Sequence, residues 1–299
     1  MPSIKDLKKR IGSTKNTQQT TRAMKMVSAA KLRRSQDAIM SQRPYARQVG
    51  DLIRLVAGMT KKAESNPLIV GRELAEGEKK KLLIVLVTSD RGLCGGFNSN
   101  IIKTAQRWLR ENESSYAEVK LGFVGRKGFD FFKSRRNNNG PYFSEVGGKV
   151  TFQKAQKLAA QVMELYTSGE VDEVQFIYNE FKNAISQKVV VETYLPLNVT
   201  NGGVEGEAKV EGPIYFVKPS AEVVLDQLLA KNFAMQAFRV LLESQAGEHG
   251  ARMSAMENAT KNAGEMIRKL TLQYNKQRQA NITKELLEII AGSESQKGA

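Results

Sequence analysis

Residues 88–100 read TSDRGLCGGFNSN and hold the only cysteine of the chain, Cys94. They follow an unbroken apolar run and precede a helical pattern. A glycine-rich turn between a strand and a helix is the usual place for phosphate binding. The glycine spacing here is G-x-x-G-G, which matches neither the dinucleotide fingerprint nor the phosphate loop with its lysine. The spacing therefore favours a structural turn that holds strand and helix close together, with nucleotide binding as the alternative.

Cys94 could act as a nucleophile only with a nearby base, and the chain has one histidine, His249, far away in sequence. No second histidine or cysteine lies near His249 to support a metal site. A neutral, packed histidine is the interpretation we favour over a ligand or a base. The acidic residues form no recognisable catalytic pair. We therefore predict no catalytic residue, no metal site and no cofactor.

Positive charge is concentrated at the N-terminal end. The whole chain has a net charge of +15, and residues 1–60 carry 13 Lys and Arg against three acidic residues. Such a surface indicates an acidic partner, which can be nucleic acid, an anionic membrane or an acidic protein. Tyr45 is the only aromatic residue in this region, so the sequence offers no base-stacking platform there. We favour an acidic protein surface over nucleic acid.

The chain divides by pattern into three parts: 1–60, 61–219 and 220–299. Residues 1–60 predict one long helix, with an apolar stripe at Ile4, Leu7 and Ile11 that continues through Met24, Val27 and Leu32 and extends to Ile39, Val49, Ile53 and Val56. Residues 61–219 alternate strand and helix patterns, with strands expected at 82–87, 119–124, 171–178 and 188–194. This alternation is typical of an α/β domain with a mostly parallel sheet. Asn98 or Ser99 can cap the helix after the glycine-rich segment.

Residues 220–299 contain no proline and predict a second very long helix. A seam of small and flexible side chains runs along it with alternating spacings of four and three, as in a coiled coil. Its members are Leu242, Ala246, His249, Met253, Met256, Thr260, Ala263, Ile267, Leu270, Tyr274, Gln277 and Asn281. We expect the two terminal helices to pair as a long antiparallel coiled coil beside the α/β domain.

Three runs are similar to those of a known family: IKDLKKRIGSTKNTQQTTRAMKMVSAAKLRR at 4–34, EHGARMSAMENATKNA at 248–263 and RQANITKELLEIIAG at 278–292. They resemble the γ subunits of bacterial F-type ATP synthases, and the resemblance covers nearly the whole chain. It implies a Rossmann-like α/β domain whose glycine-rich segment is not known to bind nucleotides.

The resemblance also implies a function. Such a subunit is not catalytic by itself. It is the central-stalk rotor, one copy per complex, and its partners are the α and β subunits of the F1 hexamer, the ε subunit and the c-ring, with no nucleic acid. It couples ion flow through the c-ring to ATP synthesis or hydrolysis in the hexamer. The implied location is the cytoplasmic face of the bacterial inner membrane, as a peripheral part of F1.

A cytoplasmic location fits the single cysteine and the absence of a signal-peptide pattern or a membrane-spanning apolar run.

Site residues are carried over by motif. The resemblance implies that Arg278, Gln279 and Thr283 hydrogen-bond a loop of the β subunit. It places Met24 and Lys25 near an acidic β segment, with Glu248 and Arg252 supporting that contact from the facing helix. Tyr215 would lie at the foot, against the c-ring and ε. No function is predicted for the loops at 137–140 and 201–212.

Two other classes of protein stay open at this point. A basic coiled-coil protein that binds nucleic acid would show a steep salt dependence of its affinity. A nucleotide-dependent enzyme built on the α/β domain would bind ATP or NAD saturably and lose that binding when Gly95 or Gly96 is changed.

Overall fold

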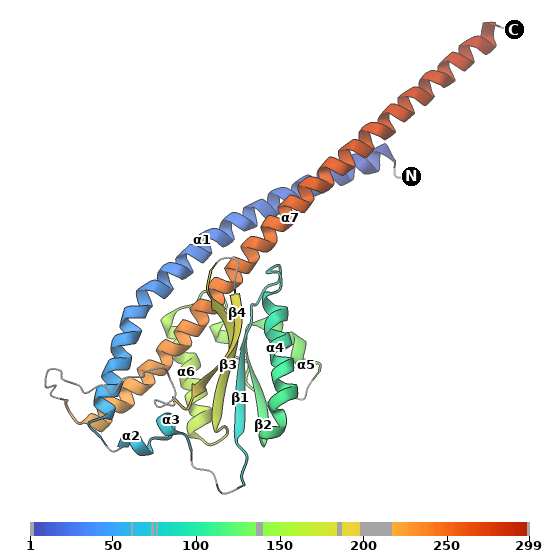
Figure 1. Cartoon of the computed structure of the whole chain (residues 1–299). Helices are drawn as coiled ribbons and strands as arrows, with labels where there is room; N and C mark the ends of the chain where they lie inside the picture. Colours follow the sequence, from blue (N-terminus) through green and yellow to red (C-terminus); the bar gives the residue numbers. More distant parts are fainter. Residues whose placement is uncertain are drawn as a thin grey trace. The chain divides into compact units, whose positions relative to one another are not determined.

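A computed structural model describes residues 3–60, 62–72, 75, 77–135, 140–183, 187–197 and 217–297. Two long helices begin and end the described chain, α1 (Ile4–Ala57) and α7 (Ala221–Lys297), as Figure 1 shows in blue and red. Between them lie four strands and several shorter helices. The expected combination of long terminal helices and an α/β domain is therefore confirmed.

The sheet has the strand order β2-β1-β3-β4. Strand β1 (Lys81–Val87) pairs parallel with β2 (Glu118–Val124) and with β3 (Glu173–Phe181), whereas β4 (Gln187–Leu195) pairs antiparallel with β3. Residues Leu82 to Val87 of β1 are all buried, as expected of a central strand covered on both faces. The prediction of a mostly parallel sheet is confirmed.

Helices cover both faces of this sheet. On one side, Leu82, Ile84 and Leu86 pack with α4 (Phe97–Asn112) and α5 (Arg126–Lys133). On the other side, Leu83 and Val85 pack in a cluster that includes α6 (Phe152–Thr167) and parts of α1 and α7. Figure 1 shows α4 and α5 on one side of the sheet and α6 on the other. The remaining short elements are α2 (Lys62–Ser65), α3 (Pro67–Val70), η1 (Glu113–Ser115) and η2 (Ser144–Val146).

Contacts divide the chain into two units, residues 1–28 with 253–299, and residues 29–252. Both units contain a stretch of α1 paired with a stretch of α7. In the first unit, Thr21 contacts Thr260 and Lys25 contacts Glu257. In the second, Ser35 contacts Gln245 and Gln42 contacts Met235. Within each unit the residue numbers of the contacting α1 side chains rise as those of their α7 partners fall, so the two helices pair antiparallel. Our division at 60/61 and 219/220 follows the helix ends instead and stays a prediction.

The packed face of α1 follows the apolar stripe that we expected, except at Met24 and Val27. Val27 is 56% exposed, whereas Ser28 beside it is 3% exposed. Buried or half-buried positions follow an unbroken three-and-four repeat: Ile4, Leu7, Ile11, Thr14, Gln18, Thr21, Lys25, Ser28, Leu32, Ser35, Ile39, Gln42, Ala46, Val49, Ile53 and Val56. Half of this seam is polar or small, so hydrophobicity alone did not reveal those members.

Helix α1 begins with a reciprocal cap. The Ser3 hydroxyl accepts from the Asp6 backbone N–H at 3.1 Å, and the Asp6 carboxylate accepts from the Ser3 backbone N–H at 3.3 Å. These bonds satisfy N–H groups that the first helical turn leaves without a partner, and the carboxylate lies at the positive end of the helix dipole.

Candidate functional site

The glycine turn, which we define as residues 88–96, is held closed by its own side chains. Leu93 and Gly95 adopt left-handed backbone conformations, with φ of 63° and 55°. The Asn98 side chain accepts from the Ser89 backbone N–H at 2.9 Å and donates to the Ser89 hydroxyl at 2.8 Å. Asn98 is thus turned back to the end of β1 and does not cap α4. The helix instead starts after Gly96 without a side-chain cap, contrary to our expectation for Asn98 or Ser99.

Cys94 is part of this closed turn. Its side chain is buried, and its sulfur accepts from the Asn98 amide at 3.3 Å and lies 3.7 Å from the Ser89 hydroxyl. These contacts are structural and place no base beside the thiol. Among the described residues, no group of three or more metal-ligating side chains is present.

Asp90 joins the turn to two neighbouring segments. One carboxylate oxygen accepts from the Arg126 backbone N–H at 3.1 Å, at the start of α5, and the other accepts from the Gly148 N–H at 3.2 Å. A Cβ atom on Gly147 would lie 2.9 Å from the carboxylate, so glycine permits this close approach. Asp90 therefore joins the glycine turn to the start of α5 and to the segment at Gly148 within the α/β domain.

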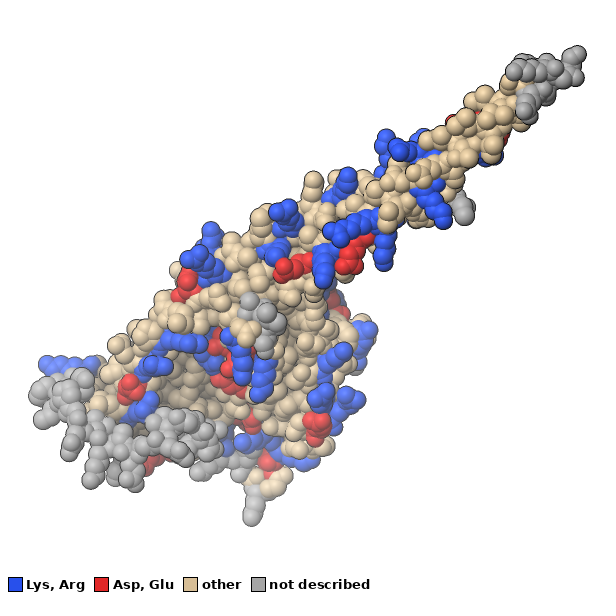
Figure 2. Space-filling model, turned by 45° about the horizontal axis from the view of Figure 1, so that its top comes forward, with Lys and Arg blue, Asp and Glu red and all other residues tan. Residues whose placement is uncertain are grey.

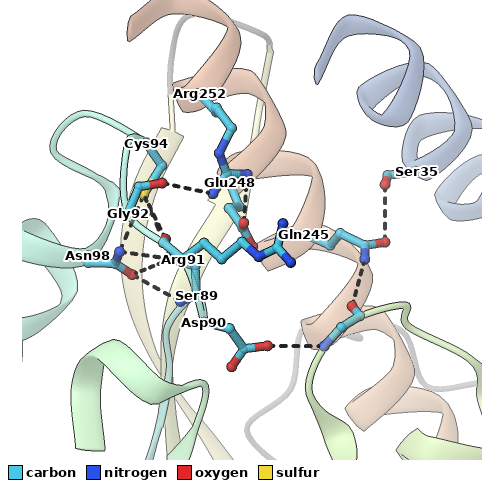
Figure 3. Close-up of polar contacts among 11 residues, drawn as sticks. Ser35, Ser89, Asp90, Arg91, Gly92, Cys94, Asn98, Gln245, Glu248 and Arg252 are labelled. Atoms are coloured by element: carbon cyan, nitrogen blue, oxygen red, sulfur yellow. Dashed lines mark hydrogen bonds and ion pairs between the residues drawn. The ribbon is translucent and has the colours of Figure 1, made fainter. Parts of the chain in front are cut away.

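Helix α7 contacts the same region through two long side chains (Figure 3). The Gln245 amide donates to the Gly148 carbonyl at 3.3 Å, and its oxygen accepts from the Ser35 hydroxyl of α1 at 3.3 Å. Arg252 donates to the Gly92 carbonyl at 3.3 Å and pairs with Glu248 at 2.7 Å. The turn is thus a docking point for α7.

Burial shifts the pKa values of the groups at this contact. Burial raises the pKa of the Glu248 carboxyl, and the Arg252 charge opposes that effect. Burial, with Arg252 and Lys31 nearby, lowers the pKa of His249 to about 4. The imidazole is therefore neutral at pH 7, which agrees with our interpretation of a packed seam histidine.

The second group of predicted residues lies where α1 and α7 pair in the other unit. Lys25 forms a 2.7 Å ion pair with Glu257, with side chains 38% and 58% exposed. Met24 beside it is half-buried. Thr21 and Thr260 lie 2.7 Å apart in the seam, and the Gln18 amide donates to the Thr260 carbonyl at 3.4 Å. The contact between α1 and α7 in this unit is thus made largely by polar side chains.

The third group lies near the C-terminal end of α7, where Arg278, Gln279 and Thr283 are all exposed. Large apolar side chains are exposed there too: Leu272, Ile282, Leu286, Leu287, Ile289 and Ile290. Thr283 lies roughly 40 Å along the helix from Glu257 at 1.5 Å per residue, so these residues do not join the Lys25 contact. Tyr215 and residues 137–139 and 201–212 lie outside the described residues.

The sequence reasoning missed three sets of contacts. They are the hydrogen bonds of Asp90, those of Gln245, and the ionic cluster around Arg239 on α7. Each joins segments far apart in sequence, so spacing along the chain carries no signal for it. The described part of the chain also contains no helix apolar enough along its length to span a membrane.

Comparisons with known proteins agree with this architecture. The family model described as ATP synthase matches residues 3–295. The chain is 49% identical to the ATP synthase gamma chain of Anaeromyxobacter sp. strain Fw109-5, over 99% of this chain and 100% of the relative. It is 48% identical to the ATP synthase gamma chain of Geobacter metallireducens, over 100% of both.

Solved structures are similar as well. One is a chain of the Tetrahymena thermophila mitochondrial ATP synthase central stalk and c-ring, with 30% identity, a TM-score of 0.59 and coverage of 80% of this chain and 99% of that one. A chain of the Euglena gracilis mitochondrial ATP synthase, at 21% identity, shares the fold with a TM-score of 0.66 over 98% of this chain and 94% of that one. The chain belongs to the family of ATP synthase gamma chains.

Proposed function

We propose that this chain is the central-stalk rotor of a bacterial F1Fo ATP synthase and has no catalytic site of its own. It couples ion flow through the c-ring to ATP synthesis or hydrolysis in the hexamer of α and β subunits. The observation that carries this proposal is the exposed apolar end of α7, in a chain whose relatives are ATP synthase gamma chains. Several large apolar side chains in water on one helix end indicate a surface that a partner covers.

The two paired helices suit a shaft that turns inside a ring. Their seam contains Thr21, Ser28 and Thr260 in place of leucine. Its cross-helix contacts include short hydrogen bonds and an exposed ion pair at Lys25. The coiled coil is thus held by a mixture of polar and apolar contacts.

The positive charge of the helices is complementary to acidic segments of the β subunit. Figure 2 shows many Lys and Arg side chains, in blue, along the helices on this face, with fewer acidic ones. Residues 1–60 carry 13 basic and three acidic residues. Attraction between exposed charges guides a partner without fixing one geometry, and it weakens with salt.

Coupling needs contacts that differ between the states of the β subunits. A shaft that touched all states equally would shift none of them, however tightly it bound. We assign the differential contacts to Met24, Lys25, Arg278, Gln279 and Thr283, with Glu248 and Arg252 in a supporting role, and the foot contact with ε and the c-ring to Tyr215. The chain would be present once per complex and attached to the membrane only through it, at the cytoplasmic face.

A double variant tests the contact at the end of α7. Gln279→Ala with Thr283→Ala removes two exposed polar side chains, so the isolated chain should keep its thermal unfolding midpoint. In assembled F1Fo, ATP-driven proton pumping should fall. Gln273→Ala with Thr271→Ala is the matched control, because it changes the same residue types at exposed positions of the same helix. Normal pumping by the Gln279/Thr283 variant would contradict the assignment of these residues.

A further inference from the structure

A second polar cluster lies away from the glycine turn, where α7 crosses the last two strands. Arg239 of α7 donates to the Tyr178 hydroxyl of β3 at 3.0 Å and pairs with the Glu192 carboxylate of β4. Tyr178 in turn donates to Glu192 at 2.6 Å. Glu243, one helical turn after Arg239, lies 3.6 Å from the guanidinium. One side chain of α7 thus contacts side chains from two strands.

Removing the charged groups of this cluster from water costs free energy, which their mutual attraction offsets. Burial disfavours the charged Arg239, but Tyr178, Glu192 and Glu243 outweigh it and hold the pKa of the guanidinium above its ordinary value. Burial raises the pKa of Glu243, whose second carboxylate oxygen is buried without a hydrogen bond. The Arg239 and Glu192 side chains are still 33% and 40% exposed, so their pair adds little net stability, and one use of such a pair is to fix how elements fit together.

Other side chains attach the same stretch of α7 to the α/β domain. The Tyr194 hydroxyl donates to the Phe233 carbonyl at 2.7 Å, and the Ser244 hydroxyl donates to the Val87 carbonyl of β1 at 3.4 Å. Further along α7, Gln245 donates to the Gly148 carbonyl and Arg252 donates to the Gly92 carbonyl. Bonds from residues 233–252 thus hold α7 over roughly 28 Å of its length. The α1 side chains Ser35 and Gln42 bond to α7, while the last turns of α1 pack in the apolar cluster that covers the sheet.

We propose that Arg239 is a positioning residue of the rotor, which fixes the rotation and register of α7 on strands β3 and β4. Torque applied to the α/β domain then passes into α7 through these oriented contacts, in addition to the apolar packing that α1 and α7 share with the domain. This inference rests on the proposed rotor function.

The physical reason is directionality. Apolar contacts are non-directional, so a helix turned about its own axis can re-form them with other rotamers. The planar guanidinium has a fixed fork of donors that matches two acceptors in one orientation only. Rotation of α7 against the sheet therefore breaks the Arg239 contacts before it breaks the apolar packing.

The test uses assembled F1Fo in vesicles and measures protons pumped per ATP hydrolysed. Arg239→Met keeps most of the side-chain volume and removes the fork, and Arg239→Lys keeps the charge alone. We expect pumping per ATP to fall about threefold or more in Arg239→Met and less in Arg239→Lys, a size typical of changes within a coupling network. Arg268→Met, at an exposed position of the same helix, is the control and should pump normally.

A purely structural role predicts a different result: less assembled complex, but the wild-type number of protons per ATP in the complex that remains. That result overturns the inference. If Arg239→Met does not assemble, Tyr178→Phe with Glu192→Gln removes one acceptor and the charge of the other at nearly constant volume and should reduce pumping per ATP in the same way. An unchanged ratio in this double variant also overturns the inference. Failure of the wild-type chain to assemble with α and β subunits would instead reject the rotor function itself.

Discussion

Arg252 of α7 donates to the carbonyl oxygen of Gly92 in the glycine turn, over 3.3 Å. The same guanidinium pairs with Glu248 at 2.7 Å, one helical turn earlier. One side chain therefore joins the helix to the turn and compensates a largely buried carboxylate. The glycine turn is an attachment of the α/β domain to α7, and its conformation serves that contact.

Replacing Arg252 should destabilise the chain strongly. Arg252→Met leaves Glu248 buried without its cation, and loss of one partner of a buried pair costs about 3 kcal/mol. Urea unfolding of the full-length chain measures this loss. The double variant Arg252→Met with Glu248→Gln should recover part of it, because the unpaired carboxylate is gone. An equal loss in both variants would show that the ion pair is unimportant here.

Acidification should destabilise the chain through His249. Its pKa is about 4 in the folded chain and near 6.5 when unfolded, so the unfolded chain binds more protons between these values. This contribution to stability is fully present above pH 6.5 and is lost as the pH falls towards 4, by up to about 1.4 kcal/mol per pH unit. His249→Gln should show a shallower loss between pH 7 and pH 5 in urea unfolding. Parallel curves for the two proteins would contradict the assignment.

Glycine is required at 125 but not at 92. Gly125 has φ of 89°, and a Cβ atom there would lie 2.1 Å from the Thr88 carbonyl oxygen. Gly125→Ala should therefore cost more than about 3 kcal/mol, since strain adds to the clash. Gly92 has no atom within 4 Å of a built Cβ, so Gly92→Ala is the control and should stay within about 1 kcal/mol of wild type. Thermal unfolding of both variants distinguishes the two positions.

The Lys25–Glu257 pair should contribute little to stability. Both side chains are more than one-third exposed, and pairs of this kind contribute about 0–1 kcal/mol, less at high salt. Lys25→Met should thus leave urea unfolding almost unchanged. In the assembled complex, however, it should lower coupled turnover if Lys25 faces an acidic β segment. A loss of several kcal/mol in the isolated chain would mean that Lys25 serves the fold and not a partner.

Much of the α/β domain was predictable because its strands are short, apolar and separated by clear turn signals. All four expected strands occur, within three residues of the predicted ends. Helix α5 was missed because it has eight residues and contains Gly128. That glycine lets the helix approach Thr88, directly after β1, and its N–H donates to the Thr88 hydroxyl at 2.9 Å. Such an approach is visible only in three dimensions.

The coiled coil was predictable in α7 but less so in α1. The α7 seam is correct from Leu242 to Gln277, whose seam positions are buried or half-buried, and it ends before Asn281, which is exposed. The α1 seam passes through Ser28, Ser35 and Gln42, which are polar. A search for apolar side chains therefore chose Val27 in place of Ser28. Counting small polar residues as seam members would have found the repeat.

The most direct test of the rotor function is assembly. This chain would be co-expressed with the α and β subunits of its own organism, purified by size, and assayed for subunit ratio and Mg-ATPase activity. We predict a stable complex with one copy of this chain per α3β3 hexamer, whose activity falls when the residues after Arg278 are replaced. Elution of this chain alone, while α and β assemble without it, would contradict the proposed function.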